Sequence, residues 1–339
     1  MVRSLPACLP ACPMIRPAES IQQESGVTTY LVDANSYREY DAGVGLLGFN
    51  VLPKLTAPKA LAARNRIQEI LRPFYLDRHY LRDDVADIMK NRAISSLDVG
   101  LTEHDLGNVE LTMPWVATTN TIPVLFWLFV NLFSKPDYVA RVRGEVEDVV
   151  AFSKDVKGDS VATIDISKLE NDCPMLMSCY REVLRLYNDF LGNRRVMQDT
   201  TIRDIDGREY LLKEGMNMQW TSGVPHMSSG IWGQDVNEFN PDRWLNPPAV
   251  DEKKRRGAMI PFGGGKHLCP GRRFALAENL GFVGAVALAF ETDGVQLPAG
   301  VGAVRLGTAI RRPIWGEVSP AFKLKRREGW ENVTLAFTC

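Results

Sequence analysis

The chain has almost no excess of charge of either sign. Its 339 residues carry 40 lysines and arginines against 41 aspartates and glutamates, a formal net charge of −1. Proteins that bind nucleic acid usually present a strongly basic face. We therefore expect no nucleic-acid partner. The run from Asp251 to Arg256 mixes both signs, and it is predicted to be a solvated loop.

Cysteine and histidine are scarce and widely spaced. The six cysteines are Cys8, Cys12, Cys173, Cys179, Cys269 and Cys339. They form no C-x-x-C pair and no cysteine–histidine spacing typical of a zinc site. A globular chain of this length needs no disulfides, so we expect mostly reduced cysteines in a compartment that faces the cytosol. His226 has no partner at a ligand spacing, and no role is predicted for it.

No long apolar run is free of interruption. Four prolines break the first twenty residues: Pro6, Pro10, Pro13 and Pro17. That segment fits neither a signal peptide nor a membrane helix, and a flexible tail or an error in the gene prediction is expected. The stretch from Leu111 to Phe133 is long enough to cross a bilayer, but it contains polar residues 118–121 and two prolines. We expect a buried helix of a globular domain there.

Helical patterns dominate the chain, and no internal repeat is present. Helices are predicted over residues 59–72, 77–92, 105–133, 136–154, 173–187 and 272–290. Residues 201–211 read as a hairpin with Asp206-Gly207 as a two-residue turn, and the last forty-odd residues as short strands. The fold class is therefore mainly α with a small β part.

A glycine-rich segment leads to a cysteine at the start of a helix. Residues 261–275 read PFGGGKHLCPGRRFA. Glycines let the backbone turn tightly and approach a flat macrocycle closely. A helix that begins after Cys269 directs N–H groups toward its sulfur, which favours the thiolate. A phosphate loop is excluded because no Gly-Lys-Ser/Thr follows. From this segment alone, the interpretation of Cys269 as a buried structural cysteine stays open.

The full pattern F-x-x-G-x-x-x-C-x-G resembles the haem-binding loop of the cytochrome P-450 superfamily. The resemblance implies haem b with the Cys269 thiolate as axial ligand of the iron, a ligand that favours O–O cleavage. It also implies that His267 reaches a haem propionate. The cofactor-binding residues implied by the resemblance are Phe262, Gly265, His267, Cys269, Gly271 and Arg194. For Arg194, an exposed arginine pair with Arg195 stays open.

Two further segments match the same family in the right order. Glu182-Val183-Leu184-Arg185 is an E-x-x-R pair, and its i,i+3 spacing puts both side chains on one helix face. Alone, it would read as a weak surface ion pair. Residues 239–244, FNPDRW, are similar to the family's F-x-P-E-R-F box with two mild departures. The resemblance implies that Glu182, Arg185 and Arg243 form a buried network supporting the cysteine loop.

The apolar stretch around Asn120 resembles the oxygen-binding helix of the family. Family members usually carry an acid and a threonine there; this chain has no acid, and Asn120 takes the threonine's place. The variant is similar to the branch of sterol 7α-hydroxylases and prostacyclin synthase. Pro123 removes the N–H that would bond the Thr119 carbonyl, so a kink is predicted. Thr119, Asn120 and Thr121 are the predicted catalytic residues, which would hold water or oxygen.

The resemblance implies a monooxygenase that uses O2 and electrons from NADPH through a flavoprotein reductase. The substrate would be a small lipophilic molecule: a sterol, a terpenoid or another secondary metabolite. The resemblance also implies the cytosolic face of the endoplasmic reticulum membrane, with a cytoplasmic location as the alternative.

Few residues precede Asn120, so we expect a P-450-type fold that is incomplete at its N-terminal side. Residues 1–50 would form a tail and a poorly defined segment, and residues 51–339 the haem-thiolate domain. Two other functions stay open. One is a reductase-independent haem-thiolate isomerase or dehydratase, suggested by the missing acid. The other is a truncated, non-catalytic remnant of the family.

Overall fold

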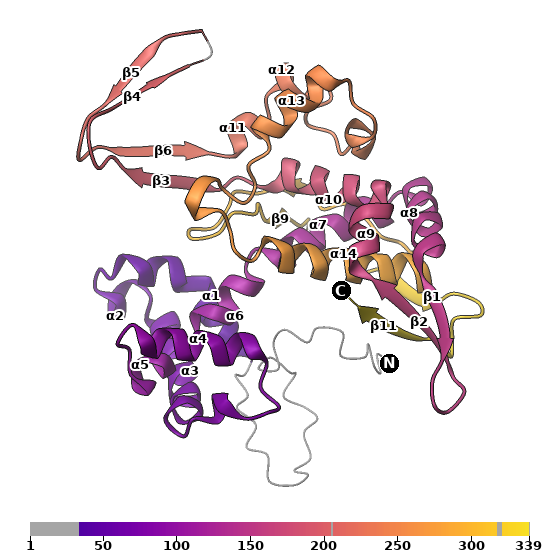
Figure 1. Cartoon of the computed structure of the whole chain (residues 1–339), viewed down its shortest axis with the longest axis horizontal. Coiled ribbons are helices and arrows are strands. Elements are labelled where there is room, and N and C mark those ends of the chain that lie inside the picture. The colour runs from indigo at the N-terminus through magenta and orange to yellow at the C-terminus, as the bar shows by residue number, and fades with distance from the viewer. Residues whose placement is uncertain (1–33, 205, 317–320, 339) are drawn as a thin grey trace. The chain divides into compact units, whose positions relative to one another are not determined.

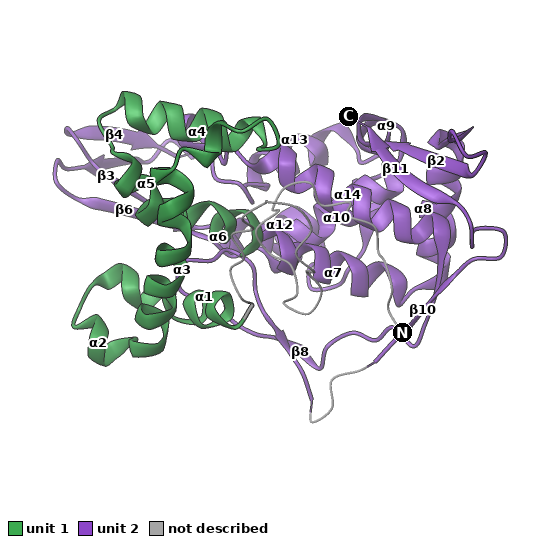
Figure 2. Cartoon of the chain, turned by 90° about the horizontal axis from the view of Figure 1, so that it is seen from below, with its two compact units in different colours: residues 1–119 green, residues 120–339 purple. Residues whose placement is uncertain are grey.

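A computed structural model describes residues 34–204, 206–316 and 321–338 of the chain. These residues divide into two compact units, Met1–Thr119 and Asn120–Cys339 (Figure 2). Helices predominate and the strands are short, so the predicted fold class is confirmed. The first twenty residues, with Cys8 and Cys12, and the terminal Cys339 lie outside the described residues. The start of a domain at residue 51 stays a prediction.

The first unit is entirely helical in its described part. Its elements are α1 (Ala34–Phe49), α2 (Pro53–Thr56), α3 (Pro58–Leu76), η1 (His79–Leu81), α4 (Asp87–Asp98), α5 (Glu103–Val109) and α6 (Thr112–Thr118). Helix α3 packs against α1 and α5 and buries Ile67 and Leu71. Thr102 and Asp105 exchange hydrogen bonds at the start of α5, which forms a capping box.

The second unit is built on four packed helices. Its helical elements are α7 (Thr121–Phe133), α8 (Pro136–Val149), α9 (Ile166–Asp172), α10 (Pro174–Tyr187), α11 (Gly223–His226), α12 (Ser229–Trp232), η2 (Pro241–Trp244), α13 (Ala249–Ala258), η3 (Gly265–His267) and α14 (Arg272–Ala289). Helices α7, α8, α10 and α14 enclose the main core. At its centre the rings of Trp127 and Tyr187 stack, with centroids 3.9 Å apart.

Short sheets border this helical core. The largest has the order β1 (Ala151–Lys154), β2 (Ser160–Asp165), β11 (Thr334–Thr338); the others are two-stranded. They pair β3 (Leu191–Arg195) with β6 (Asn217–Thr221), β4 (Thr200–Arg203) with β5 (Glu209–Leu212), β7 (Phe290–Asp293) with β10 (Lys323–Arg326), and β8 (Gly300–Val301) with β9 (Pro313–Ile314). Strands β3 to β6 form an arm, with β4 and β5 at its end (Figure 1).

Several predicted elements need correction. Residues 77–86 contain only the 3-10 helix η1, and α4 begins at Asp87, because Arg78 has a left-handed backbone and Arg82 and Ala86 have ψ of 152° and 138°, outside the helical range. The helix predicted over 136–154 ends at Val149, and residues 151–154 form β1. The predicted solvated loop from Asp251 to Arg256 is wrong, since these residues lie in α13. Acidic residues in its first turn and arginines in its last suit the helix dipole.

The hairpin over residues 201–211 is present, but its connection is longer than two residues. Strand β4 ends at Arg203, and strand β5 begins at Glu209. The Gly207 N–H donates to the Asp204 carbonyl at 3.1 Å in this connection, and Gly207 has φ +82°. Its left-handed backbone explains the glycine without requiring the tight turn that Asp-Gly suggested.

The long apolar helix is interrupted as Pro123 predicts. Helix α6 ends at Thr118 and α7 begins at Thr121, so the break lies where the carbonyl of Thr119 loses its N–H partner. By length and hydropathy, the described residues contain one helical stretch able to cross a membrane, Glu103–Phe133. Half of its most apolar window is buried, and the core helix of a globular protein meets the same criterion.

Candidate active site around Cys269

The cysteine loop is closed by backbone hydrogen bonds at its base. The Cys269 N–H donates to the Phe262 carbonyl at 3.0 Å, and the Gly263 N–H donates to the Ile260 carbonyl at 3.1 Å. Gly263 and Gly265 have φ of 77° and 63°, a left-handed backbone that disfavours side chains larger than glycine. The glycines therefore fold a compact loop that presents Cys269 at its end.

The sulfur of Cys269 lies at the start of α14. A Cβ on Gly271 would lie 3.9 Å from Sγ, and the Arg272 guanidinium donates to the Cys269 carbonyl at 3.0 Å. The positive end of the α14 dipole lies at the end of the helix that is nearest this sulfur. Burial, with the charge of Cys269 adding to it, raises the pKa of Tyr180 on α10. Tyr180 therefore stays a protonated neighbour of the cysteine.

Cys269 differs from the other cysteines that the structure describes. Cys173 and Cys179 are fully buried, and burial raises the pKa of Cys173 to about 12 and that of Cys179 further. Both stay protonated thiols of the core. Cys269 is a free thiol that is only partly buried. The alternative of a buried structural cysteine therefore describes Cys173 and Cys179, but not Cys269.

The surroundings of Cys269 suit a flat, apolar macrocycle with carboxylate substituents. Leu268 and Phe274 are 38% and 41% exposed and offer apolar surface on either side of the cysteine in the sequence. Lys266 and His267 are exposed as well and offer N–H donors. Within residues 34–204, 206–316 and 321–338, no group of three or more histidine, cysteine, aspartate and glutamate side chains could hold a bare metal ion. The donor set fits haem held through one thiolate.

A buried ion network joins α10 to η2. Glu182 and Arg185 are fully buried, and Arg243 is 8% exposed. Arg185 donates to both carboxylate oxygens of Glu182, at 2.7 and 2.9 Å, and Arg243 Nε donates to Glu182 Oε1 at 2.8 Å. The Trp244 indole donates to Oε2 at 2.8 Å. The structure thus brings together the three residues of the two motifs.

The same network fixes the chain between α11 and η2. Arg185 Nη1 donates to the carbonyls of His226 and Val236, at 3.0 and 2.8 Å. Arg243 also pairs with Asp235 at 2.9 Å. The hydrogen bond from Asn240, and after it the hydrogen bonds and charge of Arg243, lower the pKa of Asp235. Because each buried charge has several partners, the network is a rigid support rather than a reactive group.

Thr119, Asn120 and Thr121 do not share one set of partners. The Asn120 amide oxygen accepts the Ala309 N–H at 2.8 Å. The Thr119 hydroxyl donates to Asp41 Oδ1 at 3.2 Å, which also accepts the Trp115 indole N–H at 3.1 Å. Thr121 is buried. Asp41 belongs to α1, 78 residues before Thr119, and no motif in the sequence pointed to it.

Arg194, which the sequence predicts to bind the cofactor, lies in β3. That role stays a prediction. Its guanidinium donates to the Asn193 carbonyl at 2.7 Å and lies 5.3 Å from the centre of the Trp220 ring. Arg195 follows it in the strand and is exposed. Successive strand residues point to opposite faces, so only one of the two arginines can serve the same face.

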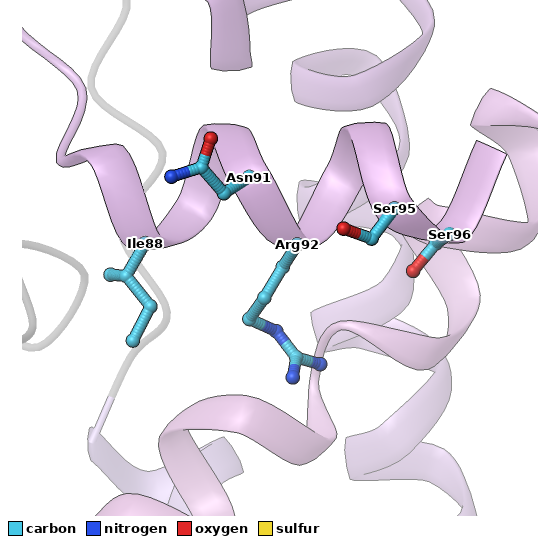
Figure 3. A pocket seen from close by; sticks show the side chains of 5 residues that line it. All are labelled: Ile88, Asn91, Arg92, Ser95 and Ser96. Atoms are coloured by element: carbon cyan, nitrogen blue, oxygen red, sulfur yellow. The ribbon is translucent and has the colours of Figure 1, made fainter. Parts of the chain in front are cut away.

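A pocket of about 570 Å³ lies elsewhere, in the first unit. It is lined by Ile88, Asn91, Arg92, Ser95 and Ser96, all on α4 (Figure 3). Arg92 already donates to both carboxylate oxygens of the buried Glu110, at 3.0 and 3.1 Å. None of the predicted site residues lines it, so it is not part of the candidate active site.

Glu278 is a half-buried carboxylate further along α14, and burial raises its pKa to about 7. The folded chain therefore holds a proton that the unfolded chain releases above about pH 4.5. Stability is expected to fall as pH rises from about 4.5 to 7. Glu278→Gln should raise the free energy of unfolding by about 1–3 kcal/mol at about pH 8, with little change at about pH 4.

Urea denaturation at the two pH values measures this difference. Glu252→Gln, at an exposed ion pair of α13, is the control and should leave the pH profile unchanged. Parallel profiles for the Glu278 variant and the unmodified chain would contradict the assigned pKa.

A helical fold with an accessible cysteine at the end of a glycine loop, supported by a buried Glu–Arg–Arg network, is the arrangement of a haem-thiolate protein. The profile of the family Cytochrome P450 matches residues 52–297, so the chain belongs to the cytochrome P450 family.

Named relatives and solved structures agree with this assignment. A cytochrome P450 monooxygenase of Gibberella zeae is 35% identical over 306 residues, which cover 88% of this chain and 58% of the relative. Cholesterol 7-alpha-monooxygenase of Cricetulus griseus is 25% identical over 290 residues, covering 78% of this chain and 53% of the relative. A crystal structure of a cytochrome P450 (CYP102L1) has a TM-score of 0.61 at 21% identity and covers 87% of this chain and 62% of its own. The chain thus spans about half to three fifths of these proteins.

Proposed function

We propose that the chain is the haem-thiolate part of a monooxygenase that inserts oxygen into a small lipophilic molecule. The observation that carries this proposal is the placement of Cys269: a partly exposed thiol at the N-terminus of α14, at the end of a glycine loop. Membership of the cytochrome P450 family supports it. Haem bound there would supply activation of O2 with electrons from a reductase.

The chain's own residues would hold the cofactor by three kinds of contact. Cys269 would ligate the iron through its sulfur. The exposed side chains of Leu268 and Phe274 would cover apolar parts of the macrocycle and lose contact with water. His267, and Arg194 from β3, would donate to the propionates.

Asp41 is the acid that lies beside Thr119 within the first unit. It accepts a hydrogen bond from Thr119, so an acid–hydroxyl pair is present although the two residues are far apart in the sequence. The missing acid was the reason to consider an isomerase or dehydratase, which stays the alternative. We favour the monooxygenase because the chain belongs to the cytochrome P450 family and is similar to a cytochrome P450 monooxygenase.

The substrate class rests on named relatives. One is cholesterol 7-alpha-monooxygenase, which is named for oxygen insertion into a sterol. Another is the cytochrome P450 monooxygenase nodJ of Hypoxylon pulicicidum, 26% identical over 288 residues that cover 82% of this chain and 55% of the relative. We propose a sterol, a terpenoid or a similar secondary metabolite as substrate, NADPH and a flavoprotein reductase as electron source, and the cytosolic face of the endoplasmic reticulum as location.

Expression with a haem precursor, followed by a reduced-CO difference spectrum, tests the proposal. A Soret band of thiolate-ligated iron, and product formed only with O2, NADPH and reductase, are the expected results. Rearrangement of a peroxide substrate without reductase would instead indicate an isomerase. A folded chain that stays colourless with excess haem would indicate a non-catalytic remnant.

Asn120→Ala is expected to leave haem binding intact and to lower turnover. The substitution removes the amide oxygen that accepts the Ala309 N–H, so the start of α7 loses one tie to the C-terminal segment. A net loss of about 1 kcal/mol in stability is expected from that bond. The ratio of Soret absorbance to protein, together with the product formed per haem, measures both effects. Asn120→Asp, which keeps the acceptor, is the matched control. Loss of haem from the alanine variant would show that Asn120 has a structural role.

A further inference from the structure

Three buried polar side chains hold the segment that enters the cysteine loop. Ile260 N–H donates to His226 Nε2 at 3.1 Å, and Asn188 Nδ2 donates to the Pro261 carbonyl at 3.1 Å. The Ser222 hydroxyl donates to Asn188 Oδ1 at 2.6 Å. His226 and Ser222 are fully buried, and Asn188 is 3% exposed. Side chains from the end of α10 and from α11 therefore hydrogen-bond to two consecutive backbone positions, Ile260 and Pro261.

This segment sets the place of the cysteine. Phe262, the next residue, accepts the Cys269 N–H, so the base of the loop begins where the gripped residues end. The residues from Gly264 to Leu268 are exposed. A glycine-rich loop of this kind is flexible unless its base is fixed. Any shift of Ile260 and Pro261 would thus be passed to Cys269.

The hydrogen bonds that hold this segment connect to the buried ion network of Glu182, Arg185 and Arg243. Arg185 donates to the backbone carbonyl of His226 at 3.0 Å, so the arginine places the residue whose ring holds Ile260. Burial, with the charge of Arg185 adding to it, lowers the pKa of His226 to about 4. The ring is therefore neutral at pH 7, and its Nε2 lone pair is available to accept the Ile260 N–H.

We propose that Asn188, Ser222 and His226 form a polar clamp that positions Cys269 for ligation of the haem iron. His226 is a positioning residue in this proposal, since it acts on Cys269 only through Ile260 and the loop base. The part that concerns iron rests on the proposed function; the fixing of the loop does not. A lost acceptor at His226 leaves a buried N–H without a partner, which costs more than the bond itself contributes.

Paired variants of the full-length chain test the clamp. His226→Phe keeps a ring of similar size and removes the acceptor, whereas His226→Gln keeps an acceptor near the position of Nε2. Amide hydrogen exchange is measured by mass spectrometry over the segment 260–269, and the fraction of thiolate-ligated iron by the reduced-CO spectrum. We expect about tenfold faster exchange in the phenylalanine variant and near-normal exchange in the glutamine variant. His104→Phe, at an exposed site on α5, should change neither.

Each outcome decides the proposal. Faster exchange and a lower thiolate-ligated fraction in the phenylalanine variant, restored by glutamine, support the clamp. Unchanged exchange, or equal effects of phenylalanine and glutamine, overturns it. If the phenylalanine variant does not fold, Asn188→Ala decides by the same exchange measurement. The unmodified chain itself could fail to bind haem while the phenylalanine variant still shows faster exchange. That result would overturn the proposed function, but it would support the clamp as a set of contacts that fixes the loop.

Discussion

Cys269→Ser is expected to abolish the Soret band of thiolate-ligated iron while the chain stays folded. The side chain is only partly buried, so the free energy of unfolding should change by less than about 1 kcal/mol. The reduced-CO difference spectrum and a urea denaturation curve measure the two quantities on the same sample.

Cys173→Ser is the matched control because it changes the same atom at a buried site. The thiol of Cys173 is fully buried, so the hydroxyl should lower the free energy of unfolding by about 1–3 kcal/mol and leave the spectrum unchanged. The two variants should therefore give opposite patterns. An unchanged spectrum in the Cys269 variant would show that another group ligates the iron.

Glu182→Leu is expected to destabilise the second unit by about 3–5 kcal/mol. The substitution removes the one carboxylate that faces both Arg185 and Arg243, and it leaves two buried guanidinium groups close together. Trp244 also loses the partner of its indole N–H. Because the cysteine loop is tied to this network through His226, haem binding should weaken as well.

Glu252→Leu on α13 provides the comparison for this effect. Glu252 also pairs with an arginine, Arg256, but both side chains are more than half exposed, so the loss should stay below about 0.5 kcal/mol. Urea denaturation followed by tryptophan fluorescence reports on the second unit through Trp127 and Trp232. Similar losses in the two variants would mean that the buried network contributes no more than a surface pair.

The sequence predicted those parts of the molecule that local patterns determine. Helices α10 and α14 were placed to within one residue, because proline or glycine marks their ends and apolar residues repeat along them. The glycine loop and the E-x-x-R pair were visible as short motifs. Helix α4 was misplaced because the backbone leaves the helical range at Arg78, Arg82 and Ala86, before α4 begins at Asp87. Such a backbone choice leaves no periodic signal.

Contacts between distant residues could not be predicted from one sequence. Asp41 meets Thr119 only because α1 and α6 pack within one unit, and His226 meets Ile260 across 34 residues. Asp41 and His226 belong to no motif and have no partner nearby in the sequence, so neither position stood out.

Helix α13 could have been predicted from the sequence. It has acidic residues in its first turn and arginines in its last turn, a charge pattern that indicates a helix.

The arm of β3 to β6 affects how the protein behaves in solution. Both strand pairs in it are two-stranded ribbons, and they expose Leu191, Met197, Ile202, Leu211 and Met216. Two-stranded ribbons are weakly stable by themselves, and open strand edges invite pairing with other chains. Charged residues on β4 and β5, with Arg203 paired to Glu209, oppose such association only in part. Solubility at high protein concentration will therefore depend more on this ribbon than on the helical core that carries Cys269.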